Sequence, residues 1–85
     1  MPLADPVEAE ARARAYLETR HRGFISRIDV MQTRRSGQFW VVKGAIEFKK
    51  SRLIVDQRFF TLQLQAETGE VTHYRLATSA QNPRI

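Results

Sequence analysis

The residues best able to do chemistry in this chain are two histidines and a few carboxylates, and their spacing favours no particular reaction. His21 and His73 are the only histidines, and there is no cysteine. A metal site would therefore need Asp or Glu ligands, because tetrahedral sites are built from nitrogen, sulfur and carboxylate groups. Only Glu67 and Glu70 are near His73 in sequence, with a turn in between. We expect no metal and no cofactor.

Acid–base and nucleophilic catalysis both lack a recognisable arrangement of residues. Asp29, Glu47 and Asp56 would form a carboxylate pair if they shared a sheet face, but carboxylates on strands generally pair with basic residues across strands. Suitable partners are Arg27, Lys43 and Arg58. The serines are not set in the Gly-x-Ser-x-Gly motif that exposes a nucleophile on a sharp turn. We predict no catalytic residues and a protein that is not an enzyme.

Basic residues are in excess and suggest a second kind of site. Fourteen Lys and Arg against nine Asp and Glu give a formal net charge of +5, which favours encounters with anionic partners. The candidate anion or nucleic-acid patch consists of Arg34, Arg35, Lys43, Lys49, Lys50, Arg52 and Arg58. Phe39 and Phe59 would be platforms on which bases stack. The alternative is that basic residues at turns keep strand edges soluble and discourage strand addition.

A helix at the N-terminus, over about residues 6–22, is the first element that must position these groups. Asp5 is a good N-cap, Pro6 suits the first helical position, and Glu8 completes a capping box. Basic residues followed by Gly23 mark the end of the helix. Its apolar stripe is built largely of small side chains, which would let it pack closely on a sheet: Pro6, Ala9, Ala13, Tyr16 and Leu17.

The periodicity changes from 3.6 to 2 after the helix, so the rest of the chain is predicted to be strand. Strands are expected at about 24–34, 38–49, 53–66 and 71–77, with a frayed tail at 78–85. Short turns between consecutive strands permit only antiparallel pairing. A chain of 85 residues has room for one hydrophobic core. We therefore predict a single α+β domain, 1–85, with one helix packed on a four-stranded antiparallel meander.

The end of the third predicted strand carries a resemblance to a known family. Residues 60–71 read Phe-Thr-Leu-Gln-Leu-Gln-Ala-Glu-Thr-Gly-Glu-Val. This resembles the closing hairpin of PepSY-type domains, where a strand ends in a D-A-x-T-G-x-V pattern, although Gln65 replaces the usual acid. The order of helix then meander is similar to the cystatin-like fold class. The resemblance implies a small binding or regulatory module, sometimes proposed to act on peptidases, with no catalytic residues.

The sheet face away from the helix is the candidate protein interface. Apolar side chains expected there are Ile25, Met31, Phe39, Val41, Ala45, Val55 and Phe59. A contiguous apolar patch of this kind commonly marks a protein interface. Self-association about a two-fold axis would bury the same patch on both copies. The alternative is that strand curvature and long Lys and Arg stems shield the patch in a monomer.

The sequence does not determine a function, but it separates two hypotheses. It favours a small non-enzymatic protein-interaction or ligand-binding module, acting as a homodimer or with another protein; the alternative is a basic nucleic-acid-binding protein. High salt would weaken nucleic-acid binding steeply but not the burial of apolar side chains. No window approaches the ~18 apolar residues of a membrane span, and the N-terminus lacks a signal-peptide pattern. We expect a cytoplasmic protein with no membrane partner.

Overall fold

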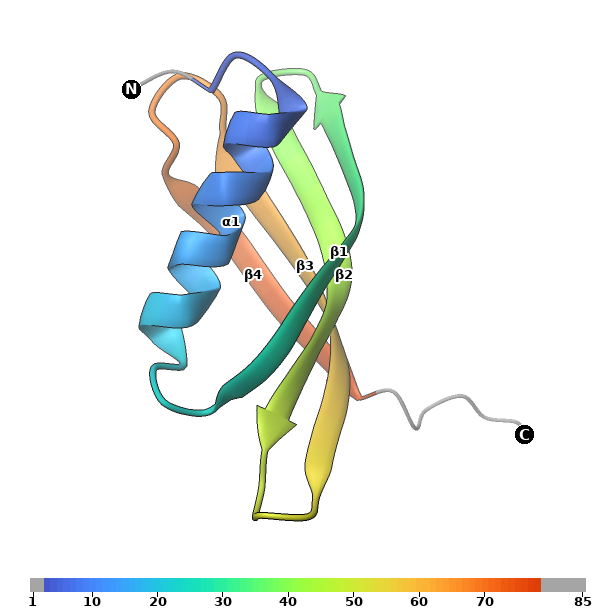
Figure 1. Cartoon of the computed structure of the whole chain (residues 1–85). Coiled ribbons are helices and arrows are strands. Elements are labelled where there is room, and N and C mark those ends of the chain that lie inside the picture. The colour runs from blue at the N-terminus through green and yellow to red at the C-terminus, as the bar shows by residue number, and fades with distance from the viewer. Residues whose placement is uncertain (1–2, 79–85) are drawn as a thin grey trace, which may run out of the picture.

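The computed structural model describes residues 3–78 as one helix and four strands. The elements are α1 (Pro6–Arg20), β1 (Ile25–Ser36), β2 (Phe39–Lys49), β3 (Val55–Gln65) and β4 (Val71–Thr78). The strands form one antiparallel sheet in the order β1-β2-β3-β4, and α1 lies across one of its faces (Figure 1). The predicted α+β arrangement, a helix on a four-stranded meander, is confirmed.

Helix α1 is capped at its start by the residues that the sequence indicated. Asp5 is extended, and its carboxylate accepts a 2.9 Å hydrogen bond from the Glu8 N–H. The Glu8 carboxylate accepts a 2.7 Å bond from the Ala4 N–H in return. These bonds satisfy N–H groups that have no partner within the helix, so the chain turns into α1 at a defined residue.

The end of α1 falls at Arg20, before the predicted residue 22. His21 is the C-cap, and its N–H donates to the Leu17 carbonyl at 3.0 Å. Gly23 then adopts a φ of 85°, in the left-handed region that glycine enters without steric cost. Arg22 therefore belongs to the turn into β1, whose first residue is Ile25.

The core lies between α1 and the inner face of the sheet, which is the face that α1 covers. Ala9, Ala13 and Leu17 are fully buried on the helix side. The buried side chains of the sheet's inner face are Trp40, Val42, Ile46, Phe60, Leu62, Leu64 and Ala66. Because two of the three helix residues are alanines, the helix backbone can approach the sheet closely.

The N-terminal segment is fastened to the sheet by Leu3. The Leu3 N–H donates to the Ala66 carbonyl at 2.6 Å, and the Leu3 carbonyl accepts a 2.9 Å bond from the Trp40 indole N–H. Trp40 is only 5% exposed, so its N–H needs a partner inside the protein. Leu3 therefore closes the core at the end where α1 begins.

Strand β1 is bent by two irregularities, and one of them depends on a glycine in β2. Its register against β2 shifts between Ile25 and Arg27 and again between Val30 and Gln32. Gly44 pairs with Val30 beside the second shift. A Cβ on Gly44 would overlap the Asp29 carbonyl oxygen and touch the Phe60 ring. The missing side chain thus allows β1 to approach β2 closely where β1 bulges.

The connection between β2 and β3 is longer than predicted. β3 begins at Val55 rather than at about residue 53. The N–H groups of Lys50 and Ser51 both donate to the Ile54 carbonyl, at 2.9 and 3.2 Å, and these bonds close the turn before the strand starts. β4 continues to Thr78, which pairs with Arg58 of β3, and the rest of the predicted tail, 79–85, lies outside the described residues.

We predict that Gly44→Ala destabilises the protein by about 1–3 kcal/mol, the usual cost of forcing extra volume into a packed site. The added methyl group must push back either the β1 backbone at Asp29 or the Phe60 ring. Urea unfolding followed by circular dichroism measures the change in the free energy of unfolding. Lys43→Ala, at an exposed neighbouring position of β2, is the control and should change it by no more than about 0.5 kcal/mol. Equal stability of both variants would contradict the role given to Gly44.

Candidate functional site

The outer face of the sheet, opposite α1, carries part of the predicted interface. Strand alternation places Phe39, Val41 and Ala45 of β2 on this face, and Ala45 pairs with Phe59 of β3. Phe59 is 41% exposed, and Phe39 and Val41 are half-buried. Ala45 is only 2% exposed, so it adds almost no accessible area. The apolar surface of the outer face therefore comes from Phe39, Val41 and Phe59.

The other three predicted interface residues are outside this central group. Ile25 pairs with Phe48 and packs against the core cluster, so its expected position on the outer face is wrong. Met31 lies at the second irregularity of β1 and is 64% exposed. Val55, at the start of β3, pairs with Lys49 and is on the outer face, but at the end of the sheet beside the β2–β3 turn. The cause for Ile25 is the irregularity just after it, which breaks the strict alternation assumed from sequence.

Polar side chains divide the apolar part of the outer face. Lys43 of β2 pairs with Thr61 of β3, between Val41 on one side and the Ala45–Phe59 pair on the other. Glu47 continues the same row of β2 beyond Ala45. The outer face is therefore a mixed surface in which apolar, cationic and anionic groups alternate over short distances.

The seven predicted basic residues do not gather into one patch. Arg34 and Arg35 are near the β1–β2 turn, whereas Lys49, Lys50 and Arg52 are at the β2–β3 turn. These turns are at opposite ends of β2, a strand of 11 residues. Arg34 pairs with Val41, eight positions from Lys49, so at about 3.3 Å per residue the nearest members of the two basic groups lie roughly 26 Å apart.

Two of these basic residues also have partners within the chain. The Arg35 guanidinium lies over the Trp40 ring, 5.5 Å from its centroid, and its Nε donates to the Gly37 carbonyl at 2.7 Å. Arg58 forms a 2.9 Å ion pair with Asp56. Arg58 pairs with Ile46, so it is on the inner side of the sheet, while Lys43 is on the outer side. The basic residues are thus divided between both ends and both faces of the sheet.

An aromatic cluster at the end of α1, which the sequence did not reveal, joins the helix to β2 and β4. His21 Nε2 is 2.6 Å from the Tyr74 hydroxyl, and the His21 ring is 4.8 Å from the Phe48 ring. Tyr16 meets Tyr74 edge to face at 5.5 Å, and the Arg20 guanidinium is over the Tyr74 ring at 5.4 Å. Helical spacing had marked Tyr16 as inward-facing, but no local signal pairs His21 with a residue of the last strand.

The environment of this cluster keeps its two polar groups uncharged at neutral pH. Burial lowers the pKa of His21 below its ordinary value of 6.5, and the neighbouring Arg20 charge lowers it further. Burial raises the pKa of Tyr74 to about 12, an effect that Arg20 opposes and Tyr16 reinforces. The neutral His21 imidazole and the protonated Tyr74 phenol can therefore share a hydrogen bond that holds the end of α1 against β4.

The second histidine is on the opposite face of the sheet from the first. His73 is exposed and pairs with Gln63 on the outer face, whereas His21 packs on the inner side with Tyr74. Within residues 3–78, no three His, Cys, Asp or Glu side chains are close enough together to hold a metal ion.

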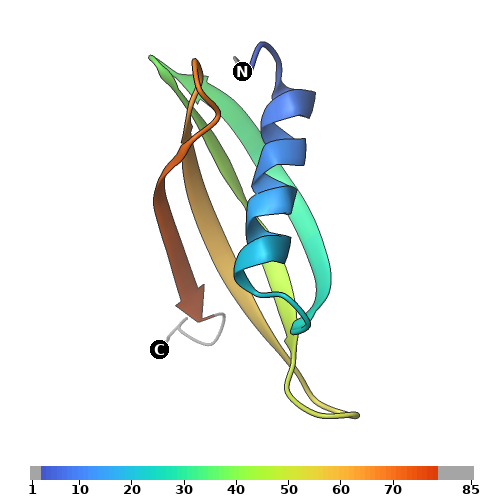
Figure 2. The same ribbon diagram turned by 90° about the vertical axis from the view of Figure 1, so that its left-hand side faces the viewer.

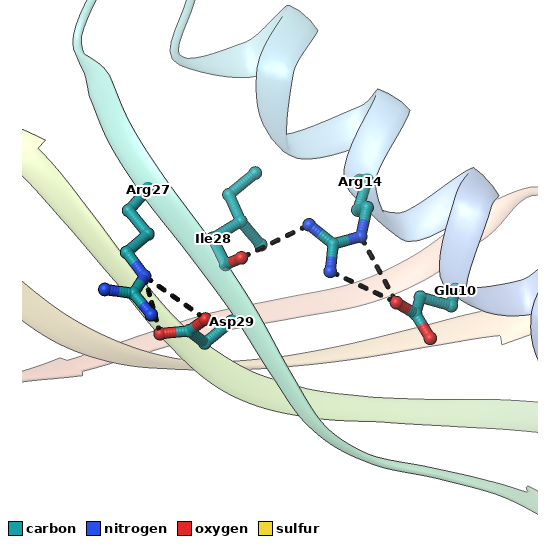
Figure 3. Close-up of polar contacts among 5 residues, drawn as sticks. All are labelled: Glu10, Arg14, Arg27, Ile28 and Asp29. Atoms are coloured by element: carbon teal, nitrogen blue, oxygen red, sulfur yellow. Dashed lines mark hydrogen bonds and ion pairs between the residues drawn. The ribbon is translucent and has the colours of Figure 1, made fainter.

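A shallow groove of about 320 Å³ runs between the end of α1 and the start of β1. The Arg14 guanidinium, at its edge, donates to the Glu10 carboxylate at 3.1 Å and to the Ile28 carbonyl at 3.2 Å (Figure 3). Arg27 forms a 3.1 Å ion pair with Asp29 (Figure 3). Both guanidinium groups thus have partners within the chain, and the Arg14 bonds tie α1 to β1.

Comparisons with protein-family models, curated proteins and solved structures found no match to this chain. The hairpin that carries the PepSY resemblance does form: the Gly69 N–H donates to the Gln65 carbonyl at 2.7 Å, and Gly69 has a φ of 76°. In the described part of the chain, no helix has the length and apolar character needed to cross a membrane.

We predict that His21 makes folding stability depend on pH. The unfolded chain binds a proton at this residue near pH 6.5, whereas the folded protein binds it only at lower pH. The stabilisation is therefore complete above pH 6.5 and is lost as the pH falls toward the folded pKa. The free energy of unfolding of the wild type, minus that of His21→Gln, should decrease over this range in urea titrations at several pH values.

The matched variant for this experiment is Arg20→Gln, which removes the neighbouring charge. NMR titration should show a higher pKa for His21 in Arg20→Gln than in the wild type. A difference between wild type and His21→Gln that stays constant from neutral to acid pH would refute the burial of a neutral His21.

Proposed function

We propose that this protein is a small non-enzymatic interaction module that self-associates as a homodimer through the outer face of its sheet. The observation that carries the proposal is the one-sided architecture. Figure 2 shows α1 on one side of the sheet, with no other described element covering the opposite side. Phe39, Val41 and Phe59 lie on that open side, and apolar side chains of an exposed face commonly mark an interface.

A two-fold dimer suits the mixed character of this face. In such a dimer each residue contact occurs twice, so one self-complementary surface is sufficient. Lys43 and Glu47 have opposite charge and lie on the same row of β2, so Lys43 of one copy can meet Glu47 of the other. A stable interface buries about 800 Å² per partner. The molecule extends 40 × 32 × 18 Å, and the broad sheet face offers an area of this size.

The proposal includes a PepSY-like or cystatin-like fold and a cytoplasmic location. The helix-then-meander order and the left-handed Gly69 of the closing hairpin support the fold. A cysteine-free chain needs no oxidising compartment, which is compatible with the location. The alternative, a basic nucleic-acid-binding protein, has less support, because its basic residues are divided between opposite ends of the sheet.

We predict that Phe59→Glu and Phe39→Glu convert the dimer into a monomer. Each change places a carboxylate where an apolar side chain would be buried, and an unpaired charge in an interface is strongly unfavourable. Sedimentation velocity should show the wild type as a dimer and both variants at the sedimentation coefficient of a monomer, with unchanged circular dichroism.

Val7→Glu is the control for this experiment. Val7 is 75% exposed on α1, away from the outer face, so its replacement adds the same charge without touching the proposed interface. This variant should remain dimeric. A wild type that sediments as a monomer at the highest accessible concentration, or a Phe59→Glu variant that remains a dimer, would refute the proposal.

A further inference from the structure

The hairpin tip, residues 49–55, exposes aliphatic side chains at a projecting end of the molecule. Leu53 is 94% exposed, Ile54 58% and Val55 52%. Both views show the β2–β3 hairpin running past the end of α1 and away from the body of the protein (Figures 1 and 2). Nothing in the packing of the core requires these three side chains to be apolar.

The charges of the hairpin tip are all positive. Lys49, Lys50 and Arg52 are exposed, and the tip contains no acidic residue. The next carboxylate along the chain, Asp56, already forms a 2.9 Å ion pair with Arg58. The tip therefore combines exposed aliphatic groups with three cations that no carboxylate within the tip neutralises.

The tip backbone is already hydrogen-bonded at several points. The Lys50 and Ser51 N–H groups donate to the Ile54 carbonyl, and the Lys49 N–H donates to the Phe24 carbonyl at 2.8 Å. The last bond also holds Phe24, which is 63% exposed, beside the tip. Unpaired backbone N–H groups are costly to transfer into a less polar environment. Internal bonding of these N–H groups lowers that cost.

We propose that the hairpin tip docks the protein on an anionic lipid surface. Leu53 and Ile54 would enter the boundary between headgroups and acyl chains, while Lys49, Lys50 and Arg52 bind acidic headgroups. In peripheral membrane binding, the free energies of apolar insertion and of electrostatic attraction add, and neither alone gives a stable attachment. This attachment does not depend on self-association through the outer face.

The chemistry of the tip favours lipid over the other anionic partners. Single-stranded nucleic acids stack successive bases on aromatic side chains, but residues 49–55 contain none, and Phe24 beside them offers a single ring. Protein interfaces concentrate their binding energy in Trp, Tyr and Arg, with Leu and Val under-represented. A membrane boundary accepts aliphatic side chains without shape complementarity. A projecting hairpin can touch a membrane without a spanning segment, and Leu53, predicted to begin a strand, belongs to this hairpin tip.

The test is co-sedimentation of the full chain with phosphatidylcholine vesicles, with and without phosphatidylserine, at low and physiological salt. The wild type should bind the phosphatidylserine vesicles, and more weakly as salt rises. The double variant Leu53→Glu with Ile54→Glu should lose at least about tenfold in affinity. Lys50→Gln should lose about fivefold. Arg34→Gln removes one charge at the opposite end of the sheet and should bind as the wild type does.

Insertion of the tip has a separate readout in Leu53→Trp, whose emission should shift to the blue when phosphatidylserine vesicles are added. The native Trp40 is buried in the core and should not respond. The proposal is overturned if the wild type fails to bind these vesicles at low salt. It is overturned equally if Arg34→Gln and Lys50→Gln weaken binding alike, or if the chain binds single-stranded RNA but not vesicles.

Discussion

The rest of the structure depends on the close packing of α1 against the inner face of the sheet. Ala9, Ala13 and Leu17 are fully buried there, and no polar or charged side chain is buried within residues 3–78. The contact between α1 and the sheet is thus mainly apolar, and it uses the only helix of the described chain. The packing of α1 on the inner face leaves the outer face as the broad surface available for binding. Two alanines in the contact stripe make the close approach possible.

Much of the fold could be predicted because its signals are local. Asp5, Pro6 and Glu8 define the helix start through bonds between neighbours in sequence, and Gly69 defines a turn by its backbone conformation. The strict alternation of β2 correctly separated its core residues from its outer ones. Ile25 was misplaced because the irregularity in β1 arises from pairing with β2 and not from its own sequence.

The candidate sites were harder to predict because they depend on distances between strands. Seven basic residues resemble a patch in sequence, but strand length separates their two groups by most of the sheet. His21 and Tyr74 are 53 positions apart in sequence, and only the meander brings them to 2.6 Å. Leu53 was predicted to lie in a strand because a short apolar run in the sequence does not distinguish a paired strand from a projecting turn.

The fastening of Leu3 gives the molecule a defined polarity. Its bonds to Ala66 and Trp40 fix the N-terminal segment at the end of the sheet where α1 begins, and Figure 1 places the hairpin tip at the other end. A fluorescent label or fusion partner joined ahead of Leu3 is therefore carried on the side remote from the hairpin. When the tip touches a surface, such a reporter would lie on the side away from that surface. The distance between the reporter and the surface would then measure the orientation of the whole molecule.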